Sequence, residues 1–464
     1  MAGPAVLMSF CVAAVASLLA ALCYAELAVR VPHRGSAYLF TYLSMGELWA
    51  FLIGWNIFVE CLIVGAAVAR DCSSYVDAIF SHQISSFTET HVGIWQVPLL
   101  AQYPDFLVAG IALLASAFIT CRAHISSWLN HIFSAINLAI FLFIIIILGF
   151  VLARPHNWST EEGGFAPFGF SGIMAGAATC FYAFTGFDVI AASSVEAQNP
   201  KRAVPMAIAI SHGLVTSAYI LISTVLTLMV AWCMHMHSRM QVPVVGILVF
   251  GFLMAFLALL VEFEALVQFR CICALLTYTF VATSIIMLRF RKSLPSSSQD
   301  PGSPVDTEQA SASEPGQLRP ALRPYLGFLG GCRPGAAVAW ALGVLVALAI
   351  TLDGVLVFRD SALHLPPWGY TLLLLLSSTT FLLSLLVLGA HQQQRRQDIF
   401  QHSPAFVPQV PMVPLTPALS ILLNIFLMLH LSYLAWLHLS IWLLMELMVY
   451  FGYGIWHSKE NQQE

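Results

Sequence analysis

Two acidic residues stand inside long apolar runs, where a charge is costly. Glu60 lies midway along the run 46–68, in WNIFVECLIVG, and Asp188 lies within the run 169–194, in CFYAFTGFDVIAASS. An ionisable side chain inside a membrane span is expensive and marks functional sites by default. Both acids are therefore candidate site residues. For Glu60, a purely structural pairing with a neighbouring helix remains an alternative.

The run around Asp188 also contains Gly172, Gly176 and Gly186, together with several aromatic residues. Glycine lowers helix stability by about 1 kcal/mol relative to alanine, so Gly186 is a predicted break point. A broken helix presents backbone donors and acceptors at mid-membrane. The alternative is close helix packing through small residues. The convergence of glycine, aromatic residues and an acid favours the break.

The other polar candidates are weaker. Arg270 lies about one turn into the run 265–288, where an interfacial or snorkelling role is as consistent as a site. His235 and His237 form an H-x-H pair in a short loop, which is weak evidence for a metal site. The sequence contains no nucleophile triad, phosphate-binding loop, H-E-x-x-H or Gly-rich nucleotide fingerprint. We therefore expect no enzymatic activity, no cofactor and no metal.

The elements that position these residues follow from composition. Of 464 residues, 59% are hydrophobic and 9% are charged, whereas soluble domains carry about 25% charged residues. The surplus apolar surface must face lipid, and a net charge of −4 excludes a nucleic-acid partner. The fold class is an all-α polytopic membrane protein with about twelve spans. The predicted spans are 4–27, 46–68, 105–121, 132–153, 169–194, 206–232, 243–261, 265–288, 335–357, 369–389, 413–433 and 436–455.

Polar segments divide these spans into regions. Residues 72–104 are a polar stretch with two histidines, and a second polar loop begins at QQQRRQD, 392–398. Residues 291–334 are rich in Pro, Ser, Gly and acids and predict a disordered linker. The predicted organisation is a core at 1–290, the cytoplasmic linker at 291–334, a four-helix region at 335–456 and a cytoplasmic tail at 457–464.

Basic residues at the span ends predict the orientation, because cytoplasmic loops are enriched in Lys and Arg. If these ends are cytoplasmic, the first span runs from outside to inside and the C-terminus is inside. The single N-x-[ST] sequon, at Asn157, then falls on the outer side and is a candidate glycosylation site. The basic residues used are Arg30, Arg34, Arg122, Lys201, Arg202, Arg289, Arg291, Lys292, Arg395, Arg396 and Lys459.

The alternation of spans fails at one connection. Lys201 and Arg202 place the start of the sixth span inside, and the basic cluster from Arg289 places the end of the eighth inside. Only residues 233–242 join the sixth and seventh spans, and ten helical residues cover about 15 Å, half of the hydrocarbon core. The sequence reads as if a helix had been removed here. A span that inverts or does not cross is the alternative.

Several motifs resemble the cationic amino acid transporters of the amino acid–polyamine–organocation superfamily. They occur in family order and cover nearly the whole chain. The motifs are AGPAV at 2–6, CYAE at 23–26, GSAYLF at 35–40, GELWAF at 46–51, GWN at 54–56, GGFAPFGFSGI at 163–173, ATCFYAF at 178–184, GFD at 186–188, EAQNP at 196–200 and YFGYGIWHS at 450–458.

The resemblance implies a LeuT-like fold of fourteen helices built on two inverted five-helix repeats. The family's first and sixth helices are unwound at their centres and bind the carboxylate and amine of an amino acid. By this match the chain starts at the family's second helix and also lacks the eighth, between Arg239 and Val242. The core at 1–290 then corresponds to family helices 2–7, 9 and 10.

The resemblance also implies site residues. The span 169–194 matches the unwound sixth helix, so four of its residues would line the substrate site, with two more nearby. Glu47 matches the acid of GELWAF, which the family needs for transport. The residues lining the site would be Phe184, Thr185, Gly186 and Asp188, with Phe181 and Ala183 near it.

Three stretches depart from the family pattern. Val195 replaces the first of two adjacent acids before AQNP. The family's A-R-A-W-S reads Ala69-Arg70-Asp71-Cys72-Ser73, and its S-I-G-T reads Cys271-Ile272-Cys273-Ala274. The last change places a side chain where the family has glycine, near the implied site, and each departure puts normal transport in doubt.

Two functions follow from the resemblance. The first is alternating-access transport of cationic amino acids such as arginine, lysine and ornithine at the plasma membrane, with Glu60 or Asp188 attracting the basic side chain. The second is a transport-inactive membrane protein with an interaction or regulatory role, since a missing first helix would remove half of the carboxylate site. The partners are the amino acid and the lipid bilayer, and the oligomeric state is left open.

Overall fold

The computed structural model describes residues 5–31, 35–80, 83–92, 105–121, 132, 134–140, 166, 168–196, 200–229, 263–290, 336–357, 367–390 and 413–454. Every regular element within these ranges is a helix. The all-α prediction is therefore confirmed for the described part of the chain.

Eight of the described helical segments are long and apolar enough to cross a membrane. Two further apolar helices, α5 (Phe106–Cys121) and α16 (Leu415–Leu429), have 16 and 15 residues. The predicted span 132–153 lies mostly outside the described residues, and 243–261 lies wholly outside them. The eight long segments are α1 (Val6–Arg30), α3 (Glu47–Ile79), the segment Gly169–Ala192 that contains α8 and α9, α10 (Pro200–Met229), α12 (Phe263–Phe290), α13 (Ala336–Val357), α14 (Pro367–Ala390) and α17 (Tyr433–Val449) with the π-helical turn η10 (Tyr450–Gly454).

The predicted polar loop 72–104 is wrong in two parts. Helix α3 continues to Ile79 and has 33 residues, about 50 Å of helix, which exceeds the roughly 30 Å core. It continues because its last two turns contain neither Gly nor Pro. A short helix, α4 (Gln83–Val92), follows. On the extension, Ser73 donates a 2.7 Å hydrogen bond to Asp105, which precedes α5.

A further helix, α2 (Ser36–Met45), joins α1 to α3 and was not predicted. Gly46 follows it with φ +98°, a conformation that side chains disfavour, and this residue turns the chain from α2 into α3. Ser44 of α2 hydrogen-bonds Ser284 of α12 at 2.8 Å. The connection is therefore packed against the core.

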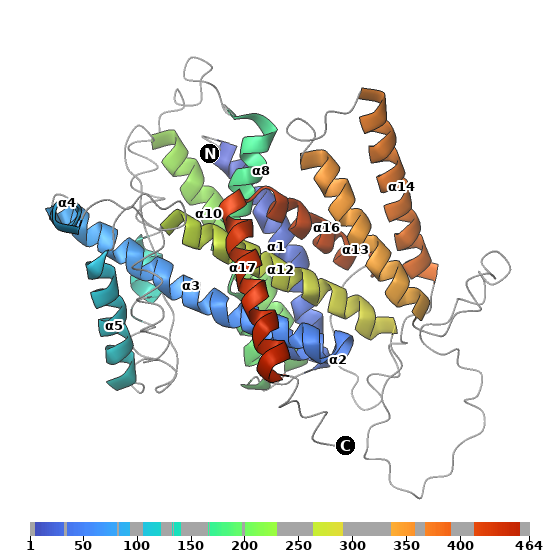
Figure 1. Ribbon diagram of the computed structural model, residues 1–464, viewed down its shortest axis with the longest axis horizontal. Helices are drawn as coiled ribbons and strands as arrows, with labels where there is room; N and C mark the ends of the chain where they lie inside the picture. The colour runs from blue at the N-terminus through green and yellow to red at the C-terminus, as the bar shows by residue number, and fades with distance from the viewer. Residues whose placement is uncertain are drawn as a thin grey trace, which may run out of the picture.

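Helix α12 lies at the centre of the bundle, where α1, α2, α3, α16 and α17 pack against it (Figure 1). Of the residues in its most apolar window, 78% are buried, against 17% for α10 and for α17. Helices α13 and α14 pack together at one edge. The exposed face of α14 is a band of leucines suited to lipid contact. It includes Leu375, Leu376, Leu382 and Leu383.

Candidate functional site

The predicted break at Gly186 is present. Helix α8 (Gly169–Cys180) passes into the 3-10 turn η5 (Phe181–Phe184), Thr185 is extended, and α9 (Phe187–Ala192) restarts the helix before the turn η6 (Ser193–Glu196). Gly186 has φ +127°, a conformation that L side chains rarely adopt. The break therefore depends on glycine at this position.

Backbone carbonyls released by the break find side-chain donors. The Thr185 hydroxyl donates to the Tyr182 carbonyl at 2.8 Å, and Ser17 of α1 donates to the Phe184 carbonyl at 3.5 Å. Unsatisfied backbone groups cost several kcal/mol in lipid, so such donors stabilise the broken segment. Helix α1 is thus attached directly to the break.

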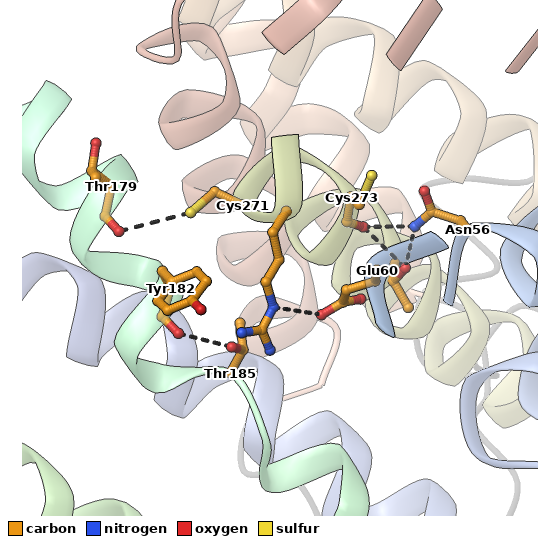
Figure 2. A network of polar contacts seen from close by, with 9 residues as sticks. Asn56, Glu60, Thr179, Tyr182, Thr185, Cys271 and Cys273 are labelled. Carbon is orange, nitrogen blue, oxygen red and sulfur yellow. Dashed lines mark hydrogen bonds and ion pairs between the residues drawn. The ribbon is translucent and has the colours of Figure 1, made fainter. Parts of the chain in front are cut away.

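Beside the break, Glu60 of α3 forms an ion pair with Arg270 of α12, with 3.6 Å between Oε1 and Nε (Figure 2). The Arg270 guanidinium also stacks over the Tyr182 ring of η5, 4.6 Å from its centroid. A cation over an aromatic face is stabilised electrostatically. The acid, the guanidinium and the ring come from three helices that are distant in sequence, and they meet at the break.

Polar contacts hold α12 between α3 and the broken segment. The Asn56 amide, one turn before Glu60, donates to the Cys273 carbonyl and to the Thr277 hydroxyl at 2.8 Å each. On the other side, the Cys271 thiol donates to the Thr179 carbonyl at 3.7 Å (Figure 2). The two positions that depart from the family pattern, Cys271 and Cys273, therefore lie beside the break. Cys271 contacts α8, and Cys273 contacts α3.

The two predicted phenylalanines lie on different sides of the break. Phe181 faces α12, where Tyr278 lies 5.7 Å away between ring centroids. Phe184 instead packs with Phe10 of α1 and Tyr219 of α10, at 6.2 and 5.5 Å. Both side chains are buried. Each phenylalanine therefore packs against the helices on its own side of the break.

Asp188 lies in the first turn of α9, two residues after Gly186. Arg270 acts on it electrostatically, and Asp188 in turn acts on Glu60, so the three charges share one region. The structure thus brings Glu60, Thr185, Gly186 and Asp188 together, with Ala183 within η5.

Glu47 lies away from this site. It is the first residue of α3, thirteen residues before Glu60, which corresponds to about 20 Å along a helix. The structure places it at the junction of α2 and α3. Any part it has in transport is therefore at one end of the bundle and outside the region of the break. Asn157, His235 and His237 lie outside the described residues.

A second buried charge cluster was not predicted. Glu26 of α1, 1% exposed, accepts hydrogen bonds from Nε and Nη2 of Arg289 on α12, at 2.9 and 2.5 Å. Arg30, one turn later on α1, adds a 2.7 Å ion pair with the same carboxylate. Two of the basic residues that predicted the cytoplasmic side therefore lie together, with one acid between them.

These features define a class: polytopic helical membrane proteins with a discontinuous span and a buried charged site beside the break. Residues 1–234 match the amino acid permease family, and residues 409–458 match the C-terminus of amino acid permease.

Curated relatives narrow this class. The chain is 62% identical to cationic amino acid transporter 4 of Mus musculus, covering 100% of the chain and 84% of the relative. It is 61% identical to the Homo sapiens protein of that name, with the same coverage. Identity to cationic amino acid transporter 2, vacuolar, of Arabidopsis thaliana is 28%, over 97% of the chain and 84% of the relative. The chain belongs to the cationic amino acid transporter family, which is a family of membrane transporters and not of enzymes.

The alignment to the mouse relative contains internal gaps. It extends over 540 positions, against 464 residues in this chain. The relative therefore carries segments within the matched region that this chain lacks.

Proposed function

We propose that the chain transports amino acids across a membrane by alternating access, with cationic amino acids such as arginine, lysine and ornithine as substrates. The observation that carries this proposal is the broken span at Gly186, with Glu60 and Asp188 beside it. A discontinuous helix offers backbone groups to the charged ends of an amino acid, and a buried acid attracts a basic side chain. Family membership supports the same substrate class.

The proposal includes the finer architecture. The arrangement would be the inverted-repeat fold of the family, with about twelve spans in this chain, a core at 1–290, a linker at 291–334 and a C-terminal region at 335–456. Phe181, Phe184, Thr185, Gly186 and Asp188 would contact the substrate together with Glu60. The cluster of Glu26, Arg30 and Arg289 joins two helix ends that were both assigned to the cytoplasm, which supports the orientation.

The first prediction concerns Glu60. Replacement by the isosteric glutamine, Glu60→Gln, removes the carboxylate and leaves the Arg270 guanidinium without its ion pair. A buried charge without its partner is strongly unfavourable. We expect uptake of labelled arginine, lysine and ornithine by cells expressing the chain to fall about tenfold or more.

Glu264→Gln is the matched control, because Glu264 is an exposed acid near the start of α12. It should leave uptake per molecule at the membrane unchanged. Surface labelling provides the amount of protein for both variants. Equal uptake by Glu60→Gln and the parent chain would remove Glu60 from the site. No uptake of any amino acid by the parent chain, present in the membrane, would overturn the proposed function.

The second candidate function is a transport-inactive membrane protein with an interaction or regulatory role. The internal segments that the mouse relative carries and this chain lacks favour it. The sequence predicts a missing helix between α10 and α12, so a chimera that carries the mouse relative's own sequence for this connection separates the two functions. Uptake by the chimera but not by the unmodified chain supports a transport-inactive protein. Equal uptake by the chimera and the unmodified chain supports transport by this chain.

A second prediction concerns location. We propose a plasma-membrane protein with a cytoplasmic C-terminus. Two plant relatives are named vacuolar and mitochondrial, so family membership does not fix the membrane. An epitope at the C-terminus should bind antibody only after permeabilisation, while surface biotin labels the chain in intact cells. Antibody binding without permeabilisation would contradict the orientation, and retention of the chain in an internal membrane would contradict the location.

A further inference from the structure

We propose that Arg270 is a resident guanidinium that competes with the basic side chain of a substrate for Glu60 and thereby lowers the preference of the site for cationic amino acids. This inference rests on the proposed function, because it assigns the charge selectivity of that same site. It makes Arg270 a specificity-determining residue of the site.

Arg270 lies where the side chain of a cationic substrate would bind. A substrate arginine at this site would need an acid for its guanidinium and an aromatic face for its plane. Both exist beside the break, as Glu60 and the Tyr182 ring. Arg270 of α12 already occupies both (Figure 2). The Arg270 side chain therefore supplies the guanidinium that a cationic substrate would bring.

The ion pair between Arg270 and Glu60 is looser than the other ion pair of α12. Arg289 binds Glu26 through two hydrogen bonds of 2.9 and 2.5 Å, and the side chains are 8% and 1% exposed. Arg270 reaches Glu60 only at 3.6 Å, and its Nε has no hydrogen-bond partner among the described residues. These two side chains are 14% and 13% exposed. One pair is a tight structural clamp, and the other is open enough to exchange.

The charges around Glu60 disfavour a second cation. Arg270 acts electrostatically on both Glu60 and Asp188, and Asp188 acts on Glu60, so Glu60 already has a cation and a second acid near it. A second guanidinium at Glu60 would lie against Arg270, and like charges at close range in a partly dry site repel strongly. A basic side chain must displace Arg270 before it binds Glu60. An uncharged side chain of the same shape is not repelled by Arg270 and leaves the ion pair between Arg270 and Glu60 intact.

The test compares arginine with citrulline, its uncharged near-isostere, in the full chain. Uptake by cells gives the ratio of arginine to citrulline transport for the parent chain, for Arg270→Gln and for Arg270→Lys. We expect Arg270→Gln to raise this ratio about tenfold or more, because a charge-assisted contact to Glu60 becomes available to arginine. Arg270→Lys keeps a resident cation and should keep the parent ratio. Arg202→Gln removes an exposed arginine of α10 and serves as the matched control.

Arg270→Gln leaves Glu60 without its ion pair, which can lower the amount of folded protein and therefore uptake. A binding measurement on purified protein tests the inference independently of that amount. Free arginine should raise the unfolding temperature of purified Arg270→Gln more than that of the parent chain, while citrulline should not. The double variant Glu60→Gln/Arg270→Gln has neither charge and should lose the preference for arginine.

Each outcome decides a different claim. An unchanged ratio of arginine to citrulline in Arg270→Gln, with citrulline still transported, overturns this inference alone. Equal stabilisation of Arg270→Gln and of the double variant by arginine also overturns it. Neither binding nor uptake of any amino acid by any variant overturns the proposed function, and the inference with it.

Discussion

Glu26→Gln should unfold the bundle more readily than any other single change considered for this chain. Glu26 is buried and is the acid shared by Arg289 and Arg30. Removal of one member of a buried pair costs about 3–5 kcal/mol, because the remaining charge is left without compensation. We expect the unfolding temperature of the purified protein to fall by about 3–5 °C, together with a lower amount in the membrane.

The size of this effect is checked by thermal unfolding in detergent, followed through size-exclusion of a fluorescent C-terminal fusion. Glu264→Gln, an exposed glutamate of α12, is the control and should change stability by less than about 0.5 kcal/mol. The double variant Glu26→Gln/Arg289→Gln should recover part of the loss, since it removes the two most buried charges and leaves only Arg30, whose side chain is 11% exposed, without its acid. Equal unfolding temperatures for Glu26→Gln and the control would show that the cluster does not stabilise the bundle.

The long apolar helices of the described residues and the break could be predicted because each depends on local sequence. Lipid requires every backbone group to be satisfied within the segment, so an apolar run of sufficient length becomes a helix. The glycine and the acid at 186–188 mark the interruption in the same way. Composition alone does not set where a helix stops once it leaves the membrane, which is why the last turns of α3 were predicted as loop.

The pairing inside the site could not be predicted, because it depends on how remote helices rotate against each other. Glu60 and Arg270 are 210 positions apart in the chain, and either could have faced lipid headgroups or another partner. Arg289 illustrates the same difficulty. At the end of an apolar run it looked like an orientation signal, and only packing against α1 shows that it binds Glu26.

Two further acids could have been found with the reasoning that selected Glu60. Asp353 of α13 and Glu446 of α17 are 2% and 0% exposed within the described bundle. Both stand inside apolar helices, where an ionisable group is costly. Gly354 adjoins Asp353, and Trp442 and Tyr450 lie one turn to either side of Glu446, so neighbouring signals of the same kind were present. The cost of an ionisable group inside an apolar helix is by itself sufficient to select both residues as candidates.

Gly186→Ala should abolish most transport while leaving the fold in place. At φ +127° an alanine is strained by about 1–3 kcal/mol, yet its Cβ would meet no atom within 4 Å. The penalty therefore falls on the backbone of the break itself and not on its neighbours. We expect the segment to relax by moving Thr185 and Phe187, the residues on either side, and with them Asp188, which disturbs the arrangement of the site around Glu60. We expect uptake per molecule to fall about tenfold or more.

Gly213→Ala is the control for this experiment. Gly213 lies within α10, its Cβ position is also open, and its φ is ordinary. Alanine there should stabilise the helix by up to about 1 kcal/mol and leave uptake unchanged. The measurement is uptake divided by surface amount, with thermal unfolding beside it. Because both substitutions add one methyl group in open space, only the backbone conformation distinguishes them. Equal uptake by the two variants would mean that transport does not depend on the left-handed turn at Gly186.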